Sequence, residues 1–234
     1  GAANVAVGQS ALESNTTASN NTAIGNNSLK ANTTGTGNVA VGIDAGTAIT
    51  TGGYNVAVGR QALMTTTTVN DNVAVGNNAL RLNVTGAKNT AVGSSALDAN
   101  TTGYDNIAVG AEALDANTTG AGNVAIGKAA LSANTTANNN VAVGVSALLA
   151  NTTGTENVAV GQVVLTQNTT GDYNTGLGRA ALYSNTTADN NTAVGYNSLL
   201  ANTTGVRNVA IGSASGDANT TGGDNVSVGA NSLS

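Results

Sequence analysis

The chain has 234 residues, of which 31 are Gly and 36 are Asn, and it contains no His, Cys, Trp, Phe or Pro. Without His or Cys it has no imidazole base, no thiolate, no disulfide and no zinc site of the usual nitrogen and sulfur kind. Only 8% of its residues are charged and the net charge is −5, so no basic surface is present that could bind nucleic acid. The sequence therefore predicts a protein that is not an enzyme, with no cofactor and no metal. It also contains no apolar stretch of membrane-spanning length and no signal-peptide pattern.

The pattern Asn-Val-Ala-Val-Gly begins at residues 4–8 and recurs every 17 residues up to residues 225–229, giving fourteen copies without insertion or deletion. We number the positions of each copy from 0, at the leading Asn, to 16. Asn occupies position 0 and Gly occupies position 4 in every copy, and Thr occupies position 13 in every copy that reaches it. The Asn and Gly residues of the first eight copies are taken as the structural repeat residues: Asn4, Gly8, Asn21, Gly25, Asn38, Gly42, Asn55, Gly59, Asn72, Gly76, Asn89, Gly93, Asn106, Gly110, Asn123 and Gly127.

Positions 5, 6, 9, 15 and 16 vary freely and carry all nineteen charged residues and all five tyrosines. A repeat that confines its charges to a few positions is typical of one coil of a solenoid, whose fixed residues face inward or stack between coils. The β-branched run Val-Ala-Val predicts a strand, and the poor helix formers Asn-Thr-Thr favour a second one. We therefore predict an all-β, parallel β-solenoid of fourteen coils with two short strands per coil, forming a single continuous array over residues 1–234.

The fixed residues each have a physical reason. The invariant Gly at position 4 indicates a positive φ or a backbone contact too close for a Cβ atom. The Gly at position 14 is replaced by Ala18, Val69, Ala137 and Ala188, so a positive φ is not required there. Asn at positions 0 and 11 is expected to form amide ladders between coils, and Thr at positions 12 and 13 is expected to form hydroxyl columns.

Strand alternation places positions 1 and 3 on one face and the Ala of position 2 on the other. We expect Val to face inward and the uncharged Ala column to face outward, where copies of the same chain would cover it in a parallel homotrimer. The alanines expected at this trimer interface are Ala6, Ala23, Ala40, Ala57, Ala74, Ala91, Ala108, Ala125, Ala142 and Ala159.

The repeated unit, as in residues 4–8 and 123–127, resembles the head repeat of trimeric autotransporter adhesins of the YadA type. The segment Ala-Leu-x-x-Asn-Thr-Thr-Gly, as in residues 113–120, is similar to repeats of trimeric tail-fibre-like proteins of bacteria and phages. This resemblance covers essentially the whole chain. It implies a left-handed β-roll, assembled in threes, in an extracellular fibre that attaches to cells, matrix or other surfaces.

The chain starts and stops within a repeat, so we expect it to be a piece of a longer fibre, attached to a membrane only through parts outside this sequence. Its expected location is the bacterial cell surface, as an adhesin head or shaft, or a virion, as part of a phage tail fibre for host attachment. The receptor is not identified by the sequence. Tyr104, Tyr183 and Tyr196 occupy variable positions and are candidates for contact with it.

Two coils have Gly46 and Gly216 in place of the Leu at position 8, which would leave space in the interior. We expect Ile49 to fill the first space, whereas the second has no evident replacement. Local looseness and a notch for a ligand are both open interpretations.

Two further functions have partial support in the sequence. Paired carboxylates such as Asp98 with Asp115, or Asp105 with Glu112, could serve a glycosidase, but isolated exposed carboxylates on a rod do not predict catalysis. An ice-binding solenoid would instead use outward columns of Asn at position 11 and Thr at position 13. That alternative requires position 12 to face inward, as Val84 suggests.

Overall fold

We analysed a computed structural model of the protein, which describes residues 1–233. It is an all-β parallel solenoid in which each repeat contributes one three-residue strand. The chain forms two compact units: unit 1 covers Gly1–Gly120, and unit 2 begins at Ala121. Unit 1 contains β1 (Val5–Val7), β2 (Thr22–Ile24), β3 (Val39–Val41), β4 (Val56–Val58), β5 (Val73–Val75), β6 (Thr90–Val92) and β7 (Ile107–Val109). Unit 2 contains β8 (Val124–Ile126), β9 (Val141–Val143), β10 (Val158–Val160), β11 (Thr175–Leu177), β12 (Thr192–Val194), β13 (Val209–Ile211) and β14 (Val226–Val228).

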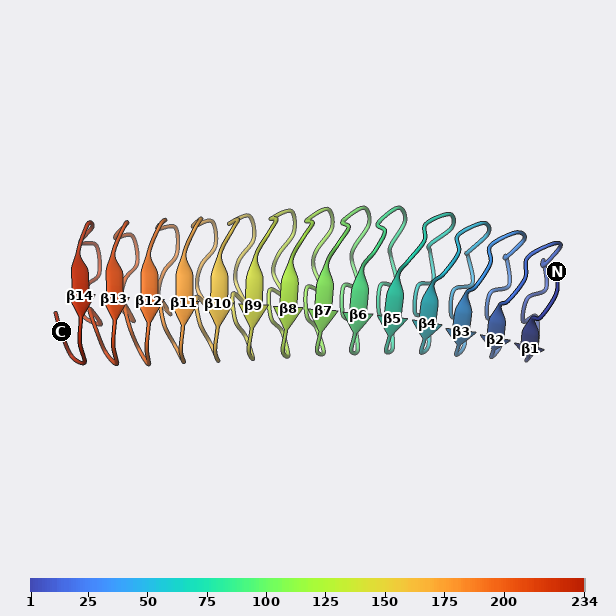
Figure 1. Ribbon diagram of the computed structural model, residues 1–234, viewed down its shortest axis with the longest axis horizontal. Coiled ribbons are helices and arrows are strands. Elements are labelled where there is room, and N and C mark those ends of the chain that lie inside the picture. The colour runs from blue at the N-terminus through green and yellow to red at the C-terminus, as the bar shows by residue number, and fades with distance from the viewer. Residues whose placement is uncertain (234) are drawn as a thin grey trace. The chain divides into compact units, whose positions relative to one another are not determined.

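Within each unit, consecutive strands pair in parallel and in register, so that every residue lies beside the one 17 positions later (Figure 1). Ala23, for example, lies between Ala6 and Ala40. Backbone hydrogen bonds join the coils outside the strands as well: Leu29 N–H donates to Ala45 O at 3.0 Å, and Asp44 N–H donates to Asn26 O at 2.9 Å. The stacking predicted from the 17-residue period is confirmed.

The prediction of a second strand in each coil is wrong, because the segment that follows the glycine of position 4 consists of turns and bends. Its residues at positions 6 and 8 adopt the left-handed backbone conformation in every coil, with φ of 57° at Asn27 and 48° at Leu29, for example. Position 16 does the same, even where it is Tyr54 or Lys88. A segment with left-handed residues at positions 6 and 8 cannot extend into a strand there. The neighbouring coil nevertheless accepts the backbone hydrogen bonds of this segment.

The glycine at position 4 meets both of the conditions predicted for it. Gly76 has φ of 140°, and a Cβ atom there would collide with the backbone of Gly93 in the next coil. The strand turns into the next segment at this point, while two backbones pass at close range. An L-residue is therefore excluded for conformational and steric reasons together.

The alanines of position 2 face inward, opposite to the prediction. Ala23, Ala40 and their counterparts through Ala193 are buried, with Gly176 in their place in β11. The valines on either side of them are half-buried or exposed. A Cβ atom built on Gly46 would lie 3.8 Å from Cβ of Ala40, so positions 8 and 2 face each other across the interior. Because Leu fills this narrow interior from one wall, the opposite wall has room only for a methyl group.

Ala23, Ala40, Ala57, Ala74, Ala91, Ala108, Ala125, Ala142 and Ala159 are therefore core residues and not an outward surface. Ala6 is exposed together with the rest of β1. The correction concerns which of the two strand faces is outside: the outward side chains are those of positions 1 and 3.

Buried asparagines form the two ladders expected from the sequence. At position 0, Asn38 N–H donates to Oδ1 of Asn21 at 2.8 Å, while Nδ2 of Asn21 donates to Gly35 O at 2.9 Å. At position 11, Nδ2 of Asn100 donates to Oδ1 of Asn83 at 2.8 Å and to Gly103 O at 2.9 Å. Most of these amides thus tie two coils together and also close their own coil, which satisfies polar groups that have no access to water. The position 11 ladder is interrupted at Ile49, and the buried Oδ1 atoms of Asn15 and Asn32 have no hydrogen-bond partner among the described residues.

The two coils without Leu at position 8 differ from each other. A Cβ atom on Gly46 would lie 3.0 Å from Cδ1 of Ile49, which is fully buried, so Ile49 fills the space as expected. Beside Gly216 lies a half-open pocket of about 270 Å³, lined in part by Leu199, Ala210 and Leu233. Both glycines occupy a left-handed position, with φ of 57° and 62°, where Gly is less strained than the usual Leu.

Candidate functional site

The outward side chains of positions 1 and 3 form an apolar surface, which we call the strand face. In unit 1 it consists of Val5, Val7, Thr22, Ile24, Val39, Val41, Val56, Val58, Val73, Val75, Thr90, Val92, Ile107 and Val109. In unit 2 it consists of Val124, Ile126, Val141, Val143, Val158, Val160, Thr175, Leu177, Thr192, Val194, Val209, Ile211, Val226 and Val228. No charged residue occurs at these positions in any copy.

The strand face is accessible to solvent in both units. Ile107 and Val109 are 41% and 37% exposed in β7, and Ile126 is 40% exposed in β8. Seven strands spaced about 4.8 Å apart, each about 10 Å long, give on the order of 300 Å² per unit. A contiguous apolar patch of that size is as large as the largest patch on many monomers and is often an interaction site.

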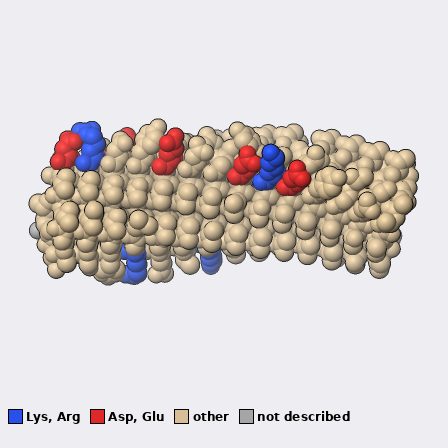
Figure 2. Space-filling model, in the orientation of Figure 1, with Lys and Arg blue, Asp and Glu red and all other residues tan. Residues whose placement is uncertain are grey.

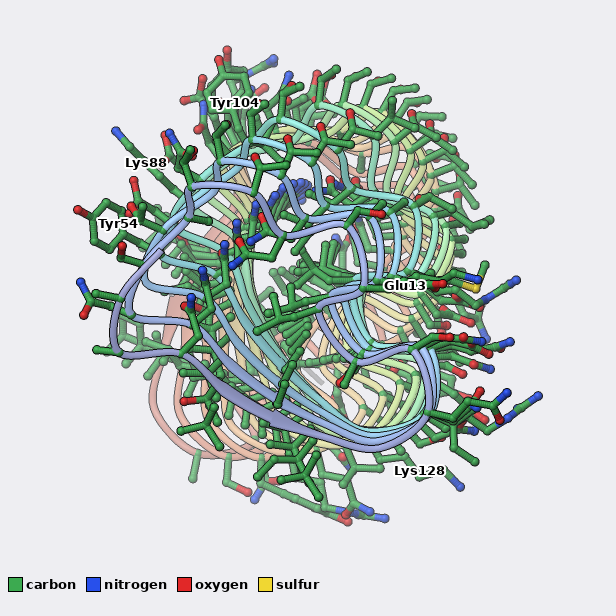
Figure 3. The ribbon with its side chains drawn as sticks, turned by 90° about the vertical axis from the view of Figure 1, so that its right-hand side faces the viewer. Glu13, Tyr54, Lys88, Tyr104 and Lys128 are labelled. Atoms are coloured by element: carbon green, nitrogen blue, oxygen red, sulfur yellow. The ribbon has the colours of Figure 1, made fainter. Side chains whose placement is uncertain are left out.

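Figure 2 shows Asp or Glu together with Lys or Arg side chains along one margin of the strand face, and Lys or Arg side chains along the other. We call positions 15 and 16, just before each strand, the leading rim, and positions 5 and 6, just after it, the trailing rim. In Figure 3, Tyr54, Lys88 and Tyr104 of the unit 1 leading rim project from the same side of the coil, whereas Glu13 at position 9 projects from another. The rims thus frame an uncharged band.

The two rims of unit 2 carry opposite charges. Its trailing rim contains Lys128 and Arg179 and no carboxylate, and its leading rim contains Glu156, Asp172, Asp189 and Asp224 with Arg207. In unit 1 both rims have mixed charge: Asp44, Arg60 and Glu112 on the trailing rim, and Asp71, Lys88 and Asp105 on the leading rim. The sequence pattern contained this asymmetry, but these positions could be recognised as the rims of one surface only once positions 1 and 3 were found to face outward.

Two carboxylates of the unit 2 leading rim are fixed by the backbone of the preceding coil. Oδ1 of Asp172 accepts hydrogen bonds from N–H of Thr155 at 2.6 Å and from its Oγ1 at 3.1 Å. Oδ1 of Asp189 accepts one from N–H of Asp172 at 2.8 Å. Asn138 makes the equivalent bond to Ala121 N–H at 2.8 Å. These side chains are therefore held in one orientation at the surface.

The carboxylates of position 9 that were weighed for catalysis form a column on a different side of the coil. Nε and one terminal nitrogen of Arg81 donate to the two carboxylate oxygens of Asp98 at 2.8 and 3.1 Å. Burial, followed by the negative charges of Glu112 and Asp98, raises the pKa of Asp115. Asp98 is thus occupied by an intrachain ion pair. In residues 1–233 no three carboxylate, Cys or His side chains gather in a way that could hold a metal ion.

The three candidate tyrosines do not come together. Tyr104 lies on the unit 1 leading rim and is 57% exposed, Tyr196 lies on the unit 2 trailing rim and is 50% exposed, and Tyr183 is half-buried at position 9. The ring of Tyr196 lies 5.7 Å from the guanidinium carbon of Arg179. Tyr54 and Tyr173, which the sequence did not single out, are as exposed as the first two.

The surface required for ice binding by Asn and Thr columns is not formed. Asn at position 11 is buried in the ladder in most coils, while Val84 at position 12 is 45% exposed. Thr at position 13 is exposed as that hypothesis required, but it stands without the Asn column. The premise that position 12 faces inward is wrong.

Comparison of the chain with protein-family models, with curated proteins and with solved structures gives no match. Within residues 1–233, no helix is long and apolar enough to cross a membrane. The fold and the strand face thus define the class of the protein as a parallel β-solenoid with one apolar and uncharged outer wall.

Proposed function

We propose that this chain is a structural or adhesive segment of an extracellular trimeric fibre, such as the head or shaft of a bacterial surface adhesin. The observation that supports it most directly is the strand face, which repeats without a charge through all fourteen copies. A fibre segment needs length and rigidity, and both follow from coils that are joined by the backbone and by buried amide ladders. It needs no catalytic group.

Self-association is the simplest way to cover the strand face. Identical copies present the same repeat at the same spacing, so that coils of one copy match coils of another along the stack. Each unit contributes a substantial part of the roughly 800 Å² that one partner buries in a standard interface. The resemblance to trimeric head repeats supports three copies. The Val and Thr columns take the role that was expected of the alanines.

The oligomer is tested by light scattering on the purified chain and on variants of β9. We expect a trimer for the wild type and dissociation for Val141→Lys and Val143→Lys, because each places a charge in the apolar contact. Thr136→Lys and Thr153→Lys, at the exposed position 13, are matched controls that should remain trimeric. Circular dichroism shows whether the dissociated variants keep their β-structure. If they unfold, the milder Val141→Thr is used instead, because it reduces the apolar contact without introducing a charge. A wild-type monomer would contradict the proposal.

Adhesion is tested by coating a surface with the trimer and measuring retention of animal cells, matrix proteins and bacterial cells. Retention that is lost when exposed rim residues such as Tyr104 and Tyr196 are changed to Ser indicates an adhesive head. Retention of bacterial cells alone would favour the alternative, a segment of a phage tail fibre used for host attachment. If the coated surface retains neither cells nor matrix proteins, the segment is a shaft and not an adhesive head.

A further inference from the structure

The opposite charges of the two unit 2 rims bear on how copies are arranged. We infer, on the basis of the proposed parallel trimer, that the trailing rim of one copy lies against the leading rim of the next, and that Arg179 pairs with Asp172 and Asp189 of the neighbouring copy.

The charges concerned are not neutralised within the chain. The ion pairs in residues 1–233 are Lys30 with Glu13, Arg81 with Asp98, and Arg207 with Asp224. The third pair lies within the leading rim and removes its only cation. The leading rim of unit 2 is left with the carboxylates of Glu156, Asp172 and Asp189, and its trailing rim is left with Lys128 and Arg179.

Symmetry decides which rims meet when two strand faces come together. A two-fold axis that lies across the stack gives antiparallel copies and places each rim against the same rim of its partner. Wherever the unit 2 strand faces of two such copies overlap, Lys128 and Arg179 would face a trailing rim that has no carboxylate, and the carboxylates would face another leading rim. Rotation about an axis along the stack keeps the copies parallel and places trailing rims against leading rims, so that opposite charges meet. Complementary charges at an interface fix orientation and register in this way.

A closed ring also fixes the height at which residues meet, since pure rotation does not shift a copy along the axis. Arg179 follows β11 (Thr175–Leu177), and Asp172 precedes the same strand. Asp189 precedes β12, one strand spacing of about 4.8 Å further along. Arg179 of one copy therefore lies at the level of two carboxylates of the next. Backbone hydrogen bonds to Oδ1 already hold both carboxylates, and no partner for Oδ2 is found among the described residues.

Within a single chain Arg179 lies too far from these carboxylates to interact with them. The three-residue strand between the two rims is about 10 Å long, and the residues that flank it on both sides add to this distance, so the separation exceeds the roughly 10 Å beyond which substitutions normally act independently. Non-additive effects of changes at Arg179 and at the carboxylates can therefore arise only between copies. This property makes a double-mutant cycle on the association constant a direct test of the arrangement.

The cycle compares wild type, Arg179→Gln, the double variant Asp172→Asn with Asp189→Asn, and all three changes together. Asn keeps the backbone hydrogen bond, as Asn138 shows at the same position, and removes only the charge. We expect each partial variant to weaken association about twofold to fivefold at each contact between copies. The combined variant should associate no more weakly than either partial variant. Added salt should weaken the association of the wild type appreciably and that of the variants little. Lys30→Gln, at position 9, is the control and should have no effect.

Independent effects of the two sets of changes would overturn the inference. Tighter association of Arg179→Gln would also do so, because it would show that like charges meet. These outcomes are distinguishable from failure of the proposed function. If Val143→Lys dissociates the oligomer while the cycle is additive, self-association through the strand face stands and only the rim pairing is wrong. If Val143→Lys leaves the oligomer intact, both are wrong.

Discussion

Cγ1 of Val164 lies 2.5 Å from the place where a Cβ atom on Gly176 would be. Val164 stands at position 7, where most copies have Ala, and Gly176 stands at position 2, where all other copies except one have Ala. The larger residue in one coil thus fills the space that the smaller residue leaves in the next. The larger Val164 and the smaller Gly176 therefore compensate in volume, so that the interior of unit 2 stays filled at this place.

Either change alone at this pair should destabilise the chain. Gly176→Ala overpacks the interior and Val164→Ala leaves a hole, each at a cost of about 1–3 kcal/mol. The double variant restores the Ala-Ala combination of other coils and should lie within about 1 kcal/mol of wild type, since the two errors compensate. Denaturant unfolding of all four proteins measures the cycle. Additive losses in the double variant would show that the contact is not the reason for Gly176.

The two glycines of position 8 should respond in opposite ways to the same substitution. Gly216→Leu places a side chain in the half-open pocket of about 270 Å³ and should stabilise the chain. The expected gain is about 1 kcal/mol, which is the benefit of burying Leu less the strain of its left-handed backbone. Gly46→Leu enters space that Ile49 and Leu29 already fill and should cost about 1–3 kcal/mol. Thermal unfolding distinguishes the two, and stabilisation by both would contradict the observed filling by Ile49.

Left-handed backbone at position 6 places Val163, a β-branched residue, at φ of 53°. Val163→Asn should stabilise the chain by about 0.5–1 kcal/mol, because Asn tolerates this conformation and a β-branched side chain does not. Val145→Asn is the control: Val145 is 46% exposed one position from a left-handed residue, but its own φ is not positive. We expect no stabilisation there. An equal effect of both changes in denaturant unfolding would attribute the gain to polarity instead of backbone strain.

Asp115 should make the chain less stable at neutral pH than at acidic pH. Burial is the main cause that raises its pKa above the ordinary 3.8. Because its carboxylate form is disfavoured in the folded chain, the loss of stability is present above the folded pKa and disappears as pH falls below 3.8. Asp115→Asn should therefore be more stable than wild type at pH 7, with the difference closing in acid.

Asp224 provides the comparison of opposite sign, since its ion pair with Arg207 lowers its pKa. The stabilising contribution of this carboxylate is present above its unfolded pKa and is lost as pH falls through the folded value. Asp224→Asn should be no more stable than wild type at pH 7. Unfolding curves of both Asn variants across pH check the two signs together. A more stable Asp224→Asn, or a less stable Asp115→Asn, would show that the cause assigned to that shift is wrong.

The repeat by itself determined the coil, the parallel register and the amide ladders. Because the period of 17 residues has no break, each coil can pair only with its equivalent neighbours. A Gly such as Gly76 that recurs at this spacing indicates a positive φ or a close backbone contact, and an Asn such as Asn100 indicates an amide ladder. It also gave the sites where one coil departs from the rest, including the filling of Gly46 by Ile49. These features depend on local chemistry that recurs identically in every copy.

Only the tertiary structure decided which side of the strand is the interior. Alternation places Val39 and Val41 on one face of the strand and Ala40 on the other, but it does not say which of the two faces is buried. The choice depends on the width of the interior, which is set by Leu29 and its equivalents reaching across from the far wall. The left-handed turns could not be predicted from the sequence either, because Leu29, Tyr54 and Lys88 are residues that do not favour this backbone conformation. Hydrogen bonds from the neighbouring coils impose that conformation, and no single repeat contains them.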